Sequence, residues 1–382
     1  MKSITYALSP MLALLVAACS GAPTPADPQE PSVSEQDISR RLAVRLARTD
    51  LVSDQAGTAV TTDANLKNAW GIAFNPAGPA WVSNAGSSTT TVYDAAGKLL
   101  LTVAVPAAAT DTEGSSPTGQ VFNASSGFAG DKFILANEHG TIVGWQPAGG
   151  ARTRADRTSA GSVYKGLAIA GAKIFATDFH NGAVDVFDAS YTKVPTVGFV
   201  DPTIPAGYAP FNIQELGGKL YVTYAQQDAD KHDDQQGAGK GFVSVFETSG
   251  TLIGRIASRG SLNAPWGLAL APASLGPKVA GKLLVGNFGD GAVQAFDVSF
   301  ATADGDGDGY GYGYGASASA VAPKTTVHAS YLGSLLGKDG KKLAIDGLWA
   351  LAVSPQGQLF FSAGPGGEAH GAFGTLSLAT SP

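Results

Sequence analysis

The chain of 382 residues contains a single cysteine, Cys19, which lies near its start. One cysteine excludes intramolecular disulfide bonds and any metal site built from several cysteine ligands. Charged residues make up only 15% of the chain and the formal net charge is −6, which argues against a nucleic-acid partner. The sequence therefore predicts a protein that binds no nucleic acid and holds no metal through thiolates.

Several catalytic motifs are also absent from the sequence. It has no Gly-x-Ser-x-Gly nucleophile elbow, no phosphate-binding glycine loop and no His-Glu-x-x-His metal motif. No apolar run after the first 18 residues is long enough to cross a membrane. An activity must therefore come from residues that the fold brings together, and the sequence does not decide whether the protein is an enzyme.

The N-terminus has the features of a bacterial lipoprotein. Lys2 precedes an apolar run, and Val16-Ala17-Ala18-Cys19 resembles a lipobox, whose cysteine receives the lipid. We expect a signal peptide at residues 1–18, then the lipidated Cys19 and a proline-rich linker at residues 19–41. Ser20 is not the aspartate associated with inner-membrane retention, so the sequence predicts export to the outer membrane of a Gram-negative bacterium. The alternative is an ordinary secretory signal with an incidental cysteine.

The rest of the chain repeats one pattern six times. "TDFHNGAVDVFDAS" (177–190) and "GNFGDGAVQAFDVS" (286–299) show the similarity between two copies. Each copy reads as a short strand, a turn, a second strand, a loop and a third strand that ends in an aromatic residue. A fourth strand is visible in "KLLLTVAV" (98–105) and "TLIGRIAS" (251–258). The sequence therefore predicts an all-β fold, a six-bladed β-propeller over residues 42–380.

The two ends of this domain are expected to close the ring. The sixth copy ends after "FGTLSLAT" without a fourth strand, whereas "LAVRLARTDLVSD" (42–54) has strand character and no blade of its own. We expect this N-terminal strand to complete the last blade. The alternative is a solvent-exposed basic helix from Arg40 to Arg48.

A Gly/Asp/Tyr-rich insert at residues 301–322 interrupts the fifth copy. Asp304, Asp306 and Asp308, followed by Gly309, resemble the start of a calcium loop. Gly315 stands where such a loop needs its bidentate acid, so the match fails at that position. The composition favours a disordered hairpin tip over a calcium site.

Four of the five histidines fall in one type of loop, between the second and third strands of a copy. In a propeller these loops open on one face, so residues far apart in the sequence become neighbours around one mouth. Acids and amides accompany the histidines in these loops. The residues predicted to bind a metal or a ligand are Glu138, His139, Asp178, His180, Asp228, Asp230, His232, Asn287, Glu368 and His370.

Two interpretations of these residues remain open. Imidazoles and carboxylates on converging loops are the ligand set of divalent transition metals, and they also serve general acid–base chemistry. Alternatively, the polar residues only cap turns, because pairs such as Asn181-Gly182 and Asp290-Gly291 are preferred in tight hairpins. The longest of these loops, about residues 226–241, contains "DADKHDD", and its acids also fit a solvated surface.

The aromatic residues of the first strands, Trp70, Trp266 and Trp349, recur at equivalent positions. We expect them to pack within the fold rather than to stack on a ligand. Tyr208 and Phe211, in the connection between the third and fourth copies, are expected to line the mouth.

The elements "DFHNGAVDVFD", "YAPFNIQELGG", "DADKHDD", "LLVGNFGDG" and "AGPGGEAHG" resemble an uncharacterised bacterial family of exported propeller-like proteins. The resemblance covers nearly everything from residue 50 to residue 376. It implies a propeller domain and export, but the family has no established activity to transfer. The length of each copy is also similar to that of NHL-type propellers and of six-bladed, calcium-dependent sugar lactonases.

Three functions are compatible with the sequence. The first is an envelope-anchored propeller that binds a small-molecule or protein ligand on the loop face, with or without a divalent metal. The second is a metal-dependent hydrolase or lactonase-like enzyme that uses the same face. The third is a protein–protein scaffold with an inert central channel. In each case we expect contact with the membrane through the lipid anchor only.

Overall fold

A computed structural model describes residues 42–108, 111–112, 114–302 and 325–379. The predicted signal peptide, Cys19, the proline-rich linker and residues 303–322 of the insert lie outside these residues. No helix in the described ranges is long and apolar enough to span a membrane.

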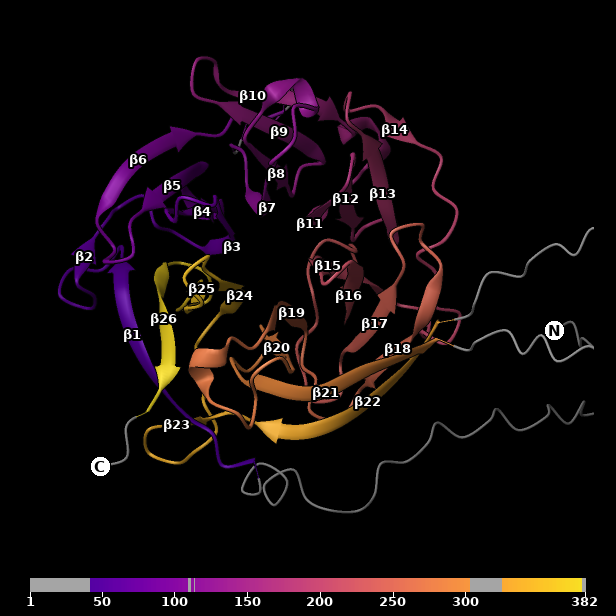
Figure 1. The fold of residues 1–382 in the computed structure, drawn as a ribbon. Helices are drawn as coiled ribbons and strands as arrows, with labels where there is room; N and C mark the ends of the chain where they lie inside the picture. Colours follow the sequence, from indigo (N-terminus) through magenta and orange to yellow (C-terminus); the bar gives the residue numbers. More distant parts are fainter. Residues whose placement is uncertain (1–41, 109–110, 113, 303–324, 380–382) are drawn as a thin grey trace, which may run out of the picture. The chain divides into compact units, whose positions relative to one another are not determined.

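The described residues form six small antiparallel sheets arranged in a ring (Figure 1). Each sheet is one blade, in which successive strands pair with their neighbours along the chain. Blade one consists of β3 (Ala69–Phe74), β4 (Ala80–Asn84), β5 (Thr89–Tyr93) and β6 (Leu99–Ala104). Blade two consists of β7 (Pro117–Phe122), β8 (Phe133–Asn137), β9 (Thr141–Gln146) and β10 (Gly150–Asp156). Blade three consists of β11 (Tyr164–Ala170), β12 (Lys173–Asp178), β13 (Ala183–Asp188) and β14 (Lys193–Val194).

Blades four to six continue the same order. Their strands are β15 (Tyr208–Leu216), β16 (Lys219–Gln226), β17 (Phe242–Phe246) and β18 (Leu252–Ser258); β19 (Pro265–Leu270), β20 (Leu283–Asn287), β21 (Val293–Thr302) and β22 (Thr325–Ser334); and β24 (Leu348–Val353), β25 (Leu359–Ala363) and β26 (Ala372–Leu378). The six-bladed β-propeller predicted from the repeat is confirmed.

The ring closes through the N-terminal strand, as predicted. Strand β1 (Arg45–Ser53) pairs antiparallel with β26, from Leu46 opposite Leu378 to Ser53 opposite Ala372, and so forms the fourth strand of blade six. The short strands β2 (Thr61–Thr62) and β23 (Leu336–Gly337) pair parallel with β1. The alternative of a basic helix is wrong for Arg45–Arg48, which belong to β1.

The core lies between neighbouring blades, because each sheet covers the face of the next. The equivalent aromatic residues of the third strands in blades three to five, Phe187, Phe246 and Phe296, are at most 3% exposed. Between blades one and two, Trp81 stacks on Phe133 with their ring centroids 3.9 Å apart. The blade repeat in the sequence is therefore a repeat of packing positions.

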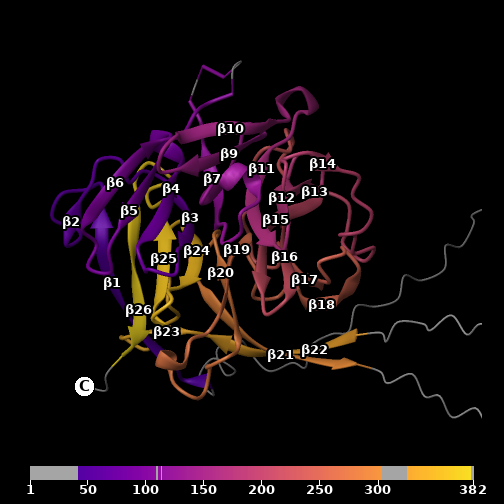
Figure 2. The same cartoon turned by 45° about the horizontal axis from the view of Figure 1, so that its top comes forward.

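Blade five carries the longest hairpin among the described strands. Strands β21 and β22 each have ten residues, and they pair along their whole length from Gln294–Ser334 to Thr302–Thr325 (Figure 2). The predicted insert therefore begins at the end of this hairpin.

Candidate functional site

A bulge in every innermost strand gives the propeller a ring of equivalent side chains around its axis. The pairing between the first and second strands shifts register once in each blade. A bulged residue leaves the regular alternation of the strand, so its side chain is directed separately from its neighbours. The bulged residues of blades one to six are Trp70, Thr118, Lys165, Phe211, Trp266 and Trp349.

Small residues follow these positions because the innermost strands approach each other closely. A Cβ atom added at Gly119 would lie 2.3 Å from the backbone nitrogen of Leu167 in the next blade. One added at Gly166 would lie 2.4 Å from Oδ1 of Asn212. Only glycine fits such contacts, so the glycines bring the bulged residues of successive blades together around the axis.

Aromatic rings fill the axis at this level. Trp70 stacks on Trp349 with ring centroids 3.5 Å apart, and Trp266 meets both of these rings edge-on. Phe288 stacks on Trp349, with their ring centroids 3.9 Å apart. The expectation that the tryptophans pack within the fold is confirmed. Phe211 is completely buried in the same cluster, so its predicted place at an open mouth is wrong.

Lys165 is the charged member of the ring of bulged residues. Its side chain is only 2% exposed. Nζ donates a hydrogen bond to Oε1 of Glu138 and another, 3.0 Å long, to Oδ1 of Asp233. The ammonium also lies 5.3 Å from the ring centroid of Trp70, which is cation–π distance. A buried lysine thus joins groups from three further blades, one, two and four, to its own.

Two loops deliver the partners of Lys165. Glu138 follows β8 directly, and Asp233 belongs to the long connection between β16 and β17. That connection folds back on itself, since Oδ1 of Asp228 accepts a hydrogen bond of 2.9 Å from the backbone nitrogen of His232. Nδ1 of His232 lies 3.0 Å from Oδ1 of Asp233. The long loop therefore places an imidazole and a carboxylate beside Lys165.

Blade six reaches the same site through Glu368, in the loop between β25 and β26. Asn68 donates a hydrogen bond of 2.5 Å to Oε2 of Glu368 and accepts one of 2.9 Å from Nε1 of Trp349. Asn68 thus fixes the carboxylate relative to the aromatic cluster. We use the name Lys165 site for Lys165, Glu138, His232, Asp233, Asp234 and Glu368.

The charges of the Lys165 site strongly affect one another. Burial lowers the pKa of Lys165, but the carboxylates of Glu138 and Asp233 outweigh this effect, so its pKa lies above the usual value and the group is an ammonium. The hydrogen bond to Asp233 raises the pKa of His232, and the same bond, with Lys165, holds the pKa of Asp233 well below its usual range.

The other two carboxylates behave in the opposite way. Burial, reinforced by the nearby Glu368 and Asp233 and opposed by Lys165, raises the pKa of Asp234 to about 7. Burial and the charge of Glu138 raise the pKa of Glu368. The site therefore contains more carboxylate than its single ammonium and imidazole neutralise, and near neutral pH it exchanges a proton at Asp234.

Two polar atoms in or beside the site are buried and have no hydrogen-bond partner among the described residues. They are Oδ2 of Asp234 and Nε1 of Trp70. The equivalent indole nitrogens of the other two ring tryptophans donate to Asn68 and to the carbonyl oxygen of Lys165. A buried polar atom without a partner costs about 1–3 kcal/mol, so two such atoms around Lys165 mark a place where a further molecule would gain hydrogen bonds.

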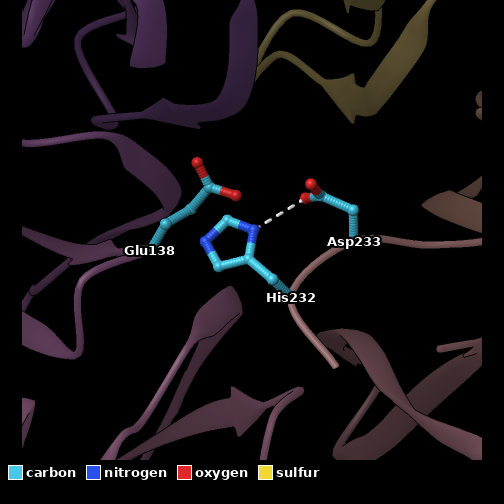
Figure 3. A group of neighbouring side chains, drawn as sticks. All are labelled: Glu138, His232 and Asp233. Carbon is cyan, nitrogen blue, oxygen red and sulfur yellow. Dashed lines mark hydrogen bonds and ion pairs between the residues drawn. The ribbon is translucent and has the colours of Figure 1, made fainter. Parts of the chain in front are cut away.

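Glu138, His232 and Asp233 are the group in the described part of the chain whose spacing would suit a metal ion. One potential ligand atom from each lies within 4.8 Å of the others, and Figure 3 shows the three side chains turned toward one another. However, Nζ of Lys165 already donates to both carboxylates. An ammonium at this position repels a divalent cation and occupies the oxygen atoms that it would need.

The other predicted histidines are not part of this group. Nδ1 of His139 contacts Asp111 and the carbonyl oxygen of Gly114, and Nδ1 of His370 lies 3.0 Å from Oδ2 of Asp54. His180 is partly buried near Gly161. The structure thus brings together Glu138, His232 and Glu368 from the predicted set. His139, His180 and His370 each lie in a separate environment.

The remaining predicted residues mainly stabilise loops. Asp178 accepts hydrogen bonds from the backbone nitrogens of Val163 and Asn181, and Asn287 donates to the carbonyl oxygen of Ser261 and to Asp290. Asp228 caps the turn before His232. Asp230 is exposed. For Asp178, Asn287 and Asp228 the structure shows the turn-capping contacts of the second interpretation.

The prediction from sequence did not include Lys165, Asp233 or Asp234 among the site residues. For Lys165 a signal exists in the repeat itself. When the first strands are aligned, Lys165 in "YKGLA" takes the place of tryptophan in "AWGIA", "PWGLA" and "LWALA". In three other blades the equivalent position holds a tryptophan. A lysine at this position therefore predicts a buried charge that needs acidic partners.

No family model matches the sequence. An uncharacterised protein of Acanthamoeba polyphaga mimivirus is 33% identical over 334 residues, which cover 82% of this chain and 75% of the viral protein. A second uncharacterised protein of the same virus is 31% identical over 349 residues, covering 85% of this chain and 84% of the relative. Both relatives are viral, so the bacterial origin expected from the sequence stays a prediction.

Two solved structures have the same fold. The soluble aldose sugar dehydrogenase of Escherichia coli, in its apo form, aligns with a TM-score of 0.51 over 87% of this chain and all of its own, at 13% identity. A Bacteroides thetaiotaomicron protein of unknown function aligns with a TM-score of 0.52 over 87% of this chain and 77% of its own, at 10% identity. At these identities the comparison shows the propeller fold alone.

Proposed function

This chain belongs to the same family as the two uncharacterised mimivirus proteins, and we propose, from its own residues, that it binds a small ligand at the Lys165 site. The observation that carries the proposal is the pair of unpartnered buried atoms, Oδ2 of Asp234 and Nε1 of Trp70, close to a lysine that is itself 2% exposed. A fold maintains such an arrangement at a cost in stability when a ligand completes it.

The charges of the site define the class of ligand. Carboxylates accept hydrogen bonds, and burial, together with the neighbouring carboxylates, raises the pKa values of Asp234 and Glu368. A ligand rich in hydrogen-bond donors, either hydroxyl groups or an amine, supplies what they lack. The ammonium of Lys165 replaces a metal ion as the counter-charge of Glu138 and Asp233, so the binding that we propose requires no divalent metal.

The test is a thermal-shift and calorimetric titration with aldoses, myo-inositol and putrescine as probes. The wild type, the site variant Asp234→Asn and the loop control Asp230→Asn are compared. We expect at least one probe to stabilise the wild type and the control equally. Its affinity for Asp234→Asn should be about ten-fold lower, because a hydrogen bond to a charged group is lost. A bound amine, which brings a positive charge to Asp234, should release more protons than a bound polyol. Equal binding to all three proteins, or none to any, contradicts the proposal.

A second candidate function is general acid–base catalysis at the same site. The pKa of Asp234, about 7, is matched to proton transfer near neutral pH, and the long loop places His232 nearby. Hydrolysis of lactone or ester substrates that disappears in Asp234→Asn, and that persists in the presence of a chelator, would support this function. Turnover that requires an added metal would support the metal-dependent hydrolase instead.

Export and lipid attachment at Cys19 remain part of the proposal on the strength of the N-terminal sequence alone. Metabolic labelling with radioactive palmitate in a Gram-negative host tests it. We expect label in the wild type and none in Cys19→Ser, with the wild-type label in the outer-membrane fraction.

A further inference from the structure

A cavity of about 660 Å³ lies on the face of the propeller opposite to the Lys165 site. Its wall includes Leu378 and Ala379, at the end of β26, whereas Glu368 lies in the loop before β26 begins. The remaining wall comes from the start of β1 and from the connection between β19 and β20 in blade five. Each strand of a blade runs from one face of the propeller to the other. The two ends of β26, and with them the two sites, therefore lie on opposite faces of the propeller.

Among the described residues that line this cavity, three are basic and none is acidic. Arg45, Lys278 and Lys338 are all exposed, and none of them forms an ion pair with a described residue. Nζ of Lys278 donates a hydrogen bond of 3.1 Å to the carbonyl oxygen of Leu42. In a chain whose net charge is −6, three uncompensated cations around one hollow attract an anion.

The rest of the lining is apolar. Leu275 and Pro277 contribute from blade five, and Leu378 contributes from β26 with 45% of its surface exposed. The volume falls within the range of about 300–1,000 Å³ that small-molecule sites occupy. An exposed apolar surface rimmed by charges of one sign is typical of a surface that binds an amphiphilic molecule.

We propose that this cavity binds one monomeric anionic amphiphile, a medium- or long-chain fatty acid. Its carboxylate lies among Arg45, Lys278 and Lys338, and the guanidinium of Arg45 offers the paired donors that a carboxylate prefers. Its hydrocarbon chain covers Pro277 and Leu378, which are exposed. The proposal is independent of the function of the Lys165 site, because the two sites share no residue.

The experiment uses the propeller with its full chain and decanoate below its micellar concentration, measured by calorimetry. We expect decanoate to bind the wild type, and decanol and inorganic phosphate to bind at least about five-fold more weakly, because each lacks one half of the interaction. The double variant Lys278→Gln/Lys338→Gln should bind decanoate about five-fold more weakly and, because only Arg45 remains as a cation, with a weaker salt dependence than the wild type.

The matched control is Lys98→Gln/Lys173→Gln, which removes the same charge from exposed positions outside this cavity. Equal weakening in both double variants would show attraction by net charge only and would overturn the proposal. An unchanged affinity of Leu378→Asp for decanoate would also overturn the proposal. Binding confined to vesicles that contain an anionic phospholipid, with none to monomeric decanoate, would overturn it in favour of membrane attachment.

Discussion

Two clusters of charge in this propeller, each built around a buried charged group, Asp131 or Lys165, are built in contrasting ways. Asp131, completely buried, faces Arg154 through two hydrogen bonds of 2.7 and 2.6 Å, and Oη of Tyr191 donates to it at 2.7 Å. One carboxylate is thus matched by one guanidinium and a phenol. The Lys165 site instead surrounds one ammonium and one imidazole with four carboxylates, and Oδ2 of Asp234 has no partner in the described part of the chain.

On the function that we propose, the difference separates a structural cluster from one that binds a ligand. In the Asp131 cluster each charge compensates another, so the group joins the turn between β13 and β14 in blade three to blade two and needs nothing further. In the Lys165 site the protein keeps an excess of acid and buried polar atoms without partners, which lowers its stability. Burial of charge alone does not indicate a site; the balance of charges and of hydrogen bonds does.

The largest effect is expected in the balanced cluster. Asp131→Ala leaves Arg154 and the buried hydroxyl of Tyr191 without their acceptor, and it should lower the free energy of unfolding by about 3 kcal/mol. Chemical denaturation measures this loss. Asp297→Ala, which breaks the exposed pair with Lys282, is the control and should cost less than about 1 kcal/mol. A comparable loss in the two variants would remove the distinction drawn for the Asp131 cluster.

Removal of the ammonium tests the other cluster. Lys165→Met keeps the length of the side chain but leaves Glu138 and Asp233 without their cation, so we expect a loss of about 2 kcal/mol at pH 7. Without Lys165 the pKa values of the native carboxylates rise above those of the unfolded chain. The native state then binds more protons, so the deficit should shrink as the pH falls toward 5.

The same variant tests whether the ammonium of Lys165 prevents a metal ion from binding. In Lys165→Met the ligand atoms of Glu138, His232 and Asp233 stay within 4.8 Å of one another and no longer face a cation. Zinc should therefore raise the melting temperature of Lys165→Met and leave that of the wild type unchanged. The double variant Lys165→Met/His232→Ala is the control and should lose the response. Zinc that stabilises the wild type as strongly would show that Lys165 does not replace a metal.

The sequence predicted the propeller and its closure because both depend on local patterns that recur. Strand alternation, turn residues and the aromatic residues at Phe187, Phe246 and Phe296 all repeat once per blade. The candidate site depends instead on a departure from the repeat. Lys165 stands where tryptophan is otherwise found, and its partners come from blades whose relative positions only the closed ring defines. The loop histidines are periodic but point into separate environments, since the direction of a loop side chain is set by contacts such as Asp54 with His370.

The smallest and most specific effect is expected at Asp234. Its pKa of about 7 in the folded protein lies above the value of about 4 expected for an unfolded chain, so between these pH values the native state binds the additional proton. The stability of the wild type should therefore fall as the pH rises from 4 to 7. Asp234→Asn removes the carboxylate that must ionise, and it should be more stable than the wild type at pH 8 and equal to it at pH 4.

Denaturant unfolding at pH 4, 6 and 8 measures this difference, with Asp230→Asn as the exposed control from the same loop. The control should follow the wild type at every pH. A variant that gains stability at pH 8 while it loses affinity for the ligand would show that the unpartnered carboxylate serves binding at the expense of stability. If Asp234→Asn is instead less stable at pH 8, Asp234 belongs with Asp131 among the residues that hold the blades together, and the contrast between the two clusters disappears.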